Sequence, residues 1–232
     1  MIPVLIIWAF KKYDLATKAK FYAHEFSKFM RRRSKSIVYP LLFLFTSYGS
    51  LQAQSLQYAI LKGTTKIGVL NYSRNVVDNT VLYKVESKVR TRFIFSISVD
   101  DNEESFFKDG ILQYSSVYRK VNGTVKTNNQ TQLSGGNYVI VDRKENETNK
   151  LSNYPITGCF LGLYYNEPSN NTSLYSDTYK QLISIVKLGE HRYKVTLPDD
   201  NYNCYYYNKG ICTKVEVVHS FYKITFSLIN NS

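Results

Sequence analysis

The amino-acid sequence predicts an all-β, mainly antiparallel protein in which a single curved sheet of about eleven strands forms an open or closed barrel. Apolar and polar side chains alternate over residues 81–99, and glycine turns recur between runs of this kind. A flat sheet of that size would expose one apolar face and two long edges, so curvature is expected. Only residues 154–181 resist a strand interpretation, and they predict one or two short capping helices.

Residues 30–53 predict a signal peptide. A basic segment at 31–35 precedes nine apolar residues at 37–45 and a small-residue exit that ends at Ala53, where we place the cut. The apolar run is shorter than the roughly 20 residues that span a bilayer, so we expect cleavage and no stable membrane anchor afterwards. Residues 1–29 are interpreted as a non-native extension from an upstream start codon. The alternative is an amphipathic helix at a membrane surface, because apolar residues fall at helical spacing over 15–26.

Residues 54–232 predict a single antiparallel β-barrel-like domain. Its first strands are expected at "LQYAILK" (56–62) and "KIGVLNYSR" (66–74), followed by one or two long strands over 81–99. Tight hairpin turns are predicted at "KDGI" (108–111), "VNGT" (121–124), "LSGGNY" (133–138) and "NKGI" (208–211), because Asp-Gly, Asn-Gly and Gly-Gly pairs supply positive φ angles. Consecutive strands should therefore be antiparallel neighbours.

The C-terminal third repeats this pattern. Strands are expected at "RYKVTLP" (192–198), "NCYYYN" (203–208), "ICTKVEVVH" (211–219) and "YKITFSL" (222–228). The apolar positions are odd before His219 and even after Tyr222, which predicts a turn or bulge at 219–221.

The three cysteines, Cys159, Cys204 and Cys212, are an odd number, so one thiol at least is free or pairs between chains. A two-residue turn at Lys209-Gly210 would pair Tyr207 with Cys212. Cys204 would then lie about three residues out of register with Cys212, farther than a disulfide reaches. The sequence thus predicts against that bridge and leaves the redox state of the three thiols open.

Charge and composition narrow the function. The chain has 30 basic and 18 acidic residues; residues 1–53 hold nine and two of them, which leaves 21 and 16, a net +5, for residues 54–232. This excess is too small to predict a nucleic-acid binder. His191 and His219 have no metal-ligand spacing partner, and the acidic runs at 100–104 and 199–200 predict solvated turns. We therefore expect no enzyme, no cofactor and no metal site.

Five stretches together resemble a known family: "LKGTTKIG" (61–68), "VYRKVNG" (117–123), "YSDTYK" (175–180), "GEHRYKVTLPD" (189–199) and "GICTKVEV" (210–217). They are similar to a family of exported, uncharacterised proteins of Gram-negative bacteria that share a domain of unknown function, and the resemblance covers nearly all of residues 56–229. That family is remotely similar to larger envelope proteins with the open half-barrel of periplasmic lipoprotein carriers. The resemblance implies a periplasmic or secreted location and a concave face that accepts acyl chains; fold alone does not fix function.

Two functions are expected from these observations. The first is a non-catalytic binder or carrier of an apolar or lipid-like ligand, lined by seven residues: Phe93, Phe95, Ile97, Tyr118, Tyr193, Val195 and Val217. The second is an envelope accessory protein with a packed core that acts through contacts with another envelope protein. An apolar pocket of at least about 300 Å³ would favour the binder. The ligand, the partner and the oligomeric state stay open.

Overall fold

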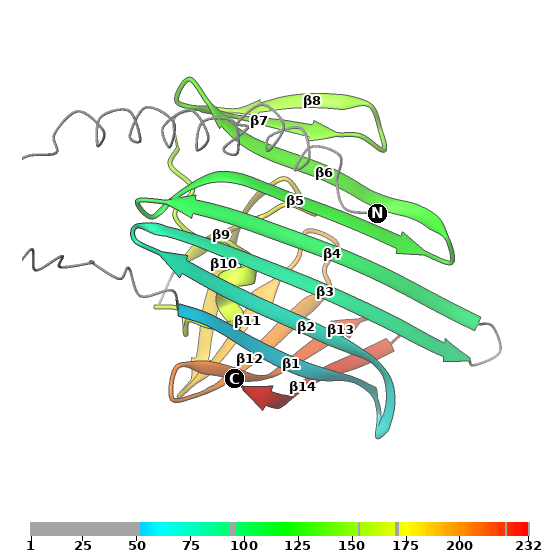
Figure 1. Ribbon diagram of the computed structural model, residues 1–232. Helices are drawn as coiled ribbons and strands as arrows, with labels where there is room; N and C mark the ends of the chain where they lie inside the picture. The colour runs from blue at the N-terminus through cyan, green and yellow to red at the C-terminus, as the bar shows by residue number, and fades with distance from the viewer. Residues whose placement is uncertain (1–51, 93–95, 153, 170–171, 221, 232) are drawn as a thin grey trace, which may run out of the picture. The chain divides into compact units, whose positions relative to one another are not determined.

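The computed structural model describes residues 52–92, 96–152, 154–169, 172–220 and 222–231, all within one compact unit that spans Tyr48–Ser232 (Figure 1). In these residues the chain forms one sheet of fourteen strands in which every neighbouring pair is antiparallel. The strands are β1 (Gln52–Lys62), β2 (Thr65–Val77), β3 (Thr80–Arg92), β4 (Ser96–Lys108), β5 (Ile111–Val121), β6 (Thr124–Ser134), β7 (Asn137–Asp142), β8 (Glu147–Leu151), β9 (Ser173–Ser176), β10 (Gln181–Gly189), β11 (Arg192–Thr196), β12 (Tyr202–Asn208), β13 (Ile211–His219) and β14 (Tyr222–Asn231).

The sheet is curved but does not close. Its order runs β8-β7-β6-β5-β4-β3-β2-β1-β14-β13-β12-β11-β10-β9, so β1 pairs with both β2 and β14 near the centre. Strands β8 and β9 are the two edges, and no backbone pairing joins them in the described part of the chain. This confirms the all-β class and the single curved sheet. Of the two expected forms, open or closed, the barrel is open.

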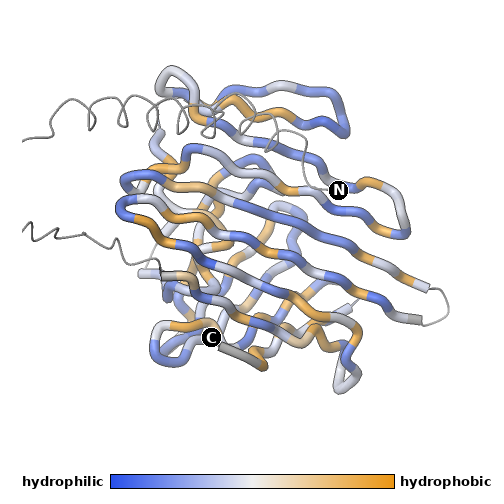
Figure 2. Tube along the Cα trace, in the orientation of Figure 1, coloured by the Kyte–Doolittle hydropathy of each residue, from blue (hydrophilic) through white to orange (hydrophobic). Residues whose placement is uncertain are grey.

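The strand count exceeds the eleven predicted, for two local reasons. Strand β8 is polar and largely exposed, so it carries no apolar alternation. Strand β9 and the start of β10 fall in the stretch that was expected to be helical. The described residues of 81–99 belong to two strands, β3 and β4, and the alternation holds across both because Thr91 pairs with Ile97. Figure 2 shows the resulting apolar and polar residues in turn along these strands.

The hairpin turns follow the sequence prediction. Asp109, Asn122 and Lys209 have positive φ angles of 52°, 49° and 50°, and each precedes a glycine that also has positive φ. A pair of left-handed residues gives the turn whose twist matches that of the two strands. His219 at the end of β13 pairs with Tyr222 at the start of β14, so the chain turns back between these two strands as expected.

The expectation of one or two short helices is met by one short helix. Among the described residues of 154–181, the helical structure is a five-residue 3-10 helix, η1 (Phe160–Tyr164), which buries Leu161 and Leu163. It contacts β3, β9 and β13, so it lies between the two halves of the sheet. Gly158 and Gly162 lie in this segment, where the chain must turn within a packed interior.

Tyrosines dominate the packed interior. Tyr58 and Tyr72 are 0% and 1% exposed, and each ring centroid lies 5.3 Å from that of Tyr164 on η1. A second cluster of buried residues forms on β10–β13, where Tyr193 and Tyr207 meet edge to face with centroids 5.6 Å apart. Such aromatic pairs add to the free energy gained from burial alone. The η1 backbone is tied into this core, because Tyr207 Oη donates to the Leu163 carbonyl at 2.8 Å.

The cysteine register agrees with the prediction at the turn. Tyr207 pairs with Cys212 and Asn208 with Ile211, but a bulge between Tyr206 and Tyr207 moves Cys204 opposite Glu216. All three cysteines are free and buried. The bulge adds one residue of stagger, which separates Cys204 from Cys212 further than a regular hairpin would.

Candidate functional site

One face of the sheet encloses the tyrosine core, and we call it the inner face; Tyr58, Tyr72, Val85, Val117 and Tyr205 lie on it and are at most 4% exposed. Charged residues interrupt this face on β4 and β5. Glu103 pairs with Val85 on one side and Val117 on the other, so its side chain shares the inner face with them.

Arg119 holds two carboxylates of β4. Its Nε and Nη2 donate to Asp101 Oδ1 and Oδ2 at 3.1 and 2.9 Å, and Nη2 also donates to Glu103 Oε1 at 3.0 Å. The side chains of Arg119, Asp101 and Glu103 are 31%, 13% and 22% exposed. We call these three residues the inner charge cluster. Water can therefore reach these charged groups, whereas Tyr58, Tyr72 and Val117 on the same face are buried.

The charge balance of the cluster affects its protonation. The pKa of Glu103 is raised to about 8, because burial and the neighbouring Asp101 both raise it and Arg119 offsets only part of the increase. Burial by itself lowers the pKa of Arg119, but Asp101 and Glu103 raise it above its usual value. Arg119 thus stays charged, and Glu103 is the member that can hold a proton near neutral pH.

Polar groups of the opposite half of the sheet face the cluster. The charge of Glu103 contributes to raising the pKa values of Tyr164 and Tyr205, after burial and nearer groups. On β12, Asn203 Nδ2 lies 3.5 Å from Tyr205 Oη, while Asn203 Oδ1 is buried with no hydrogen-bond partner among the described residues. The cluster is therefore flanked by hydrogen-bonding groups from η1 and β12.

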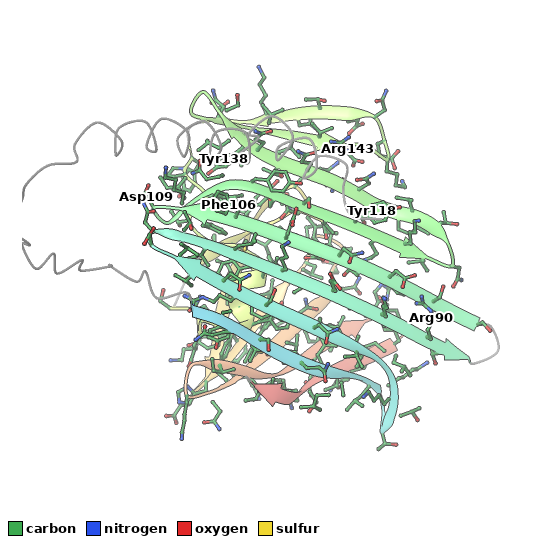
Figure 3. The ribbon with its side chains drawn as sticks, in the orientation of Figure 1. Arg90, Phe106, Asp109, Tyr118, Tyr138 and Arg143 are labelled. Atoms are coloured by element: carbon green, nitrogen blue, oxygen red, sulfur yellow. The ribbon has the colours of Figure 1, made fainter. Side chains whose placement is uncertain are left out.

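The inner face is buried around the tyrosine core and partly exposed beyond the inner charge cluster. Beyond the cluster, Val89, Val99 and Val121 form one row across β3–β5, and Val217 and Ile224 pair across β13 and β14; all five are partly exposed. We call these five residues the apolar mouth. A depression of about 770 Å³ lies at its rim, around Arg90, Thr91, Ser96, Ile97, Ser98 and Asn122. Figure 3 labels Arg90 at this end of the sheet and Asp109 at the other.

The seven predicted lining residues lie in different places. Phe93 and Phe95 are outside the described residues. Ile97 is 40% exposed at the rim, and Tyr193 and Val195 are buried at 3% and 0% in the second core cluster, beside Val217.

Tyr118 lies on the other face of the sheet from the other predicted lining residues that the structure describes, because successive side chains of β5 point to opposite faces. Val117 and Arg119 point inward, so Tyr118 lies on the outer face, where the Lys120 ammonium is 5.4 Å from its ring centroid. The structure thus brings Tyr193, Val195 and Val217 together and places Tyr118 apart from them. The inner charge cluster was missed, although Asp101 and Glu103 share the odd parity of Val99 in the sequence.

Other polar groups lie outside this region. Glu167 accepts a hydrogen bond from Tyr193 Oη at 2.9 Å and lies 3.0 Å from His191 Nδ1, while the His219 ring stacks on Tyr222 with centroids 4.6 Å apart. In the part of the chain that the structure describes, no three His, Cys, Asp or Glu side chains are grouped to hold a metal ion. The same residues contain no helix long and apolar enough to cross a membrane.

Comparisons with known proteins agree with this fold. Residues 58–229 match the model of a family described as a domain of unknown function, DUF6134. A crystal structure of a β-barrel-like protein of the domain of unknown function DUF1849 from Brucella abortus is similar, with a TM-score of 0.50 and 12% sequence identity over 78% of this chain and 98% of that chain. At that identity the likeness shows the fold alone. A search of curated proteins gives no match.

Proposed function

Because the chain belongs to the DUF6134 family, whose name gives no activity, we propose a function from the inner face. This protein is a non-catalytic binder that holds an apolar or lipid-like ligand. The observation that carries the proposal is the apolar mouth. Its five side chains face inward yet stay partly exposed, whereas Tyr58, Tyr72 and Val85 on the same face are at most 4% exposed. Partly exposed apolar groups on a concave face are the usual walls of a ligand site.

The inner charge cluster fits an amphipathic ligand. An apolar body would cover the mouth valines, and a polar end would reach Arg119, Asp101 and Glu103. Ligand sites combine mostly apolar walls with a few placed polar groups that fix orientation. Arg119 holds both carboxylates in place, as expected of groups that fix the position of a ligand's polar end.

The place of action is part of the proposal. A protein that carries a lipid-like molecule is useful where that molecule must cross an aqueous space, and the signal peptide predicted at 30–53 would export this chain to the periplasm of a Gram-negative bacterium. Residues 30–51 lie outside the described residues, and a cut after Ala53 would remove only the first two residues of β1. Strand β1 could then still pair with β2 and β14.

Ligand binding is tested with a matched pair of neighbours on β13. Val217 faces inward and belongs to the mouth, whereas Val218 faces outward and pairs with Lys223. The protein is purified from its own host and examined by native mass spectrometry, and a fluorescent fatty acid is then titrated into wild type, Val217→Gln and Val218→Gln. We expect a co-purifying lipid, and a loss of affinity of about tenfold in Val217→Gln only.

Two results would overturn the binder. One is the absence of both a co-purified lipid and saturable binding of the fluorescent fatty acid. The other is an equal loss of affinity in Val217→Gln and Val218→Gln, with thermal unfolding midpoints equal to that of wild type. Either result would favour the second function, an accessory protein with a packed interior that contacts another envelope protein.

A further inference from the structure

The β9–β10 hairpin is attached to the sheet through one part of its backbone. Strand β9 pairs with Gln181–Ser184 of β10, and the pairing of β10 with β11 begins only at Ile185. We call residues 173–184 the flap. Besides its own ladder, the flap has one isolated β-bridge to the described part of the chain, between Cys159 and Tyr175, in which Tyr175 N donates to the Gly158 carbonyl at 3.0 Å.

Side chains hold the turn of the flap against β5 and β6. Asp177 Oδ1 accepts hydrogen bonds from Ser115 Oγ at 2.6 Å and from Thr131 Oγ1 at 3.1 Å. The Asp177 backbone carbonyl accepts one from Asn129 Nδ2 at 2.8 Å. We call these contacts and the two described next the polar seam.

The seam extends to both sides of Asp177. Tyr175 Oη and Thr131 Oγ1 are 2.9 Å apart, and Lys180 Nζ lies 2.9 Å from Asp142 Oδ2 at the end of β7. Its partners on the sheet are deeply buried: Ser115 and Thr131 are 0% exposed and Asn129 is 3% exposed. The two halves of the open barrel thus meet through polar side chains and not through a strand ladder.

A polar seam and a strand ladder differ in what opening costs. Seam groups that separate can bond to water, and the net cost of each such exchange is only about 1 kcal/mol. Opening would also uncover Leu174, Tyr175 and Ile183, which are 7%, 0% and 6% exposed. That apolar surface keeps the flap closed most of the time, and an apolar ligand could cover it when the flap opens.

We propose that residues 173–184 form a flap that opens as one unit about Ile185 and so uncovers the inner face from the side. Its role in admitting a ligand rests on the proposed function, whereas the opening itself does not. Asp177 is the central group, because it makes three of the five seam contacts.

The titration of Asp177 supports this view. Its pKa is raised to about 6, because burial raises it by more than the hydrogen bonds from Ser115 and Thr131 lower it. The titratable groups within electrostatic reach are Glu103, Tyr114, Cys159 and Tyr175, and the nearby Lys180 is already paired with Asp142. The closed flap therefore binds the proton more tightly than an open, solvated one would, and raising the pH from about 4 to above 6 favours opening.

Hydrogen exchange of the full chain without ligand tests the flap. The variants are Thr131→Val, which removes two seam contacts, and Asp177→Asn, which keeps an acceptor but no charge. The control is Thr225→Val on the outer side of β14, next to the inward-facing Ile224 and Phe226. At about pH 7 we expect residues 173–184 to exchange about tenfold faster in Thr131→Val, with β2–β4 and the control unchanged.

Asp177→Asn supplies the second readout. Its flap should exchange more slowly than that of wild type at about pH 7, and the difference in intrinsic-rate-corrected rate should shrink at about pH 4.5, where Asp177 of the closed flap is neutral. If Thr131→Val does not fold, Lys180→Met replaces it, since that residue is 27% exposed. Equal acceleration of all strands, or no acceleration of residues 173–184, would overturn the flap. Neither result depends on ligand binding.

Discussion

Arg119 and Asp101 form a two-point ion pair across β4 and β5: the Nε–Oδ1 and Nη2–Oδ2 distances are 3.1 and 2.9 Å. The paired bonds fix the plane of the guanidinium, which leaves the same Nη2 directed at Glu103. One arginine on the inner face thus serves two carboxylates, and the stability of this region depends on it.

Removal of Arg119 should destabilise the protein more than removal of an exposed arginine. In Arg119→Met, Asp101 and Glu103 lose their cationic partner on a partly desolvated face, and we expect the free energy of unfolding to fall by about 2 kcal/mol. Arg90 pairs with Asp100 outside, with side chains 56% and 39% exposed, so Arg90→Met should cost less than about 1 kcal/mol. Urea unfolding of both variants measures the difference. Equal losses of unfolding free energy in the two variants would show that the location of Arg119 on the inner face adds no stability.

Glu103 should make the protein less stable as the pH rises. The folded state holds the proton up to about pH 8, whereas the unfolded chain releases it near its ordinary pKa of 4.5. The stability gained from this proton is therefore lost as the pH rises between these two values. We expect Glu103→Gln to be more stable than wild type by about 1–2 kcal/mol at about pH 8.5, and by less at about pH 5.5.

The matched control for Glu103 is its neighbour Glu104, which points outward and pairs with Lys84. Glu104→Gln should keep the pH dependence of wild type in thermal unfolding. A wild-type stability that rises from about pH 5.5 to 8.5 would contradict the assignment. So would a pH dependence that Glu103→Gln leaves unchanged.

The sequence predicts the strands well and the closure of the sheet poorly, for a physical reason. Alternation and turn residues are local, so β3, β4 and the turns at Asp109 and Asn122 could be located in advance. The seam joins Ser115 to Asp177, which are 62 residues apart, and no local pattern encodes such a contact. For the candidate site, the available signal was that Asp101 and Glu103 stand at odd-numbered positions, which are otherwise apolar in this part of the sequence.

Gly68 should tolerate no side chain. It lies at the bulge of β1 and β2, and a Cβ there would overlap the Lys88 backbone carbonyl oxygen, which belongs to a strand ladder and has little freedom to move. We expect Gly68→Ala to destabilise the protein by about 2 kcal/mol or more. In Gly189→Ala the new Cβ meets nothing within 4 Å, so its unfolding midpoint should stay close to that of wild type. Tolerance of Gly68→Ala would mean that β2 and β3 can separate there.

The three thiols should react in an order set by the faces they occupy. Tyr205 points inward, so its neighbour Cys204 lies on the outer face and is 8% exposed, whereas Cys159 and Cys212 are 3% and 0% exposed inside the clusters. Burial raises the pKa of Cys159 to about 11 and that of Cys212 to about 12, which keeps both as unreactive thiols at neutral pH.

A thiol reagent added to the native protein should label one cysteine slowly, and all three only after denaturation. Cys204→Ser should remove the slow native reaction, because only the outer thiol can be reached without opening the core. Cys212→Ser, the control, should keep it. Rapid labelling of two thiols in the native state would mean that the inner clusters open far more often than their burial implies, since reaction of a buried thiol requires exposure by local unfolding.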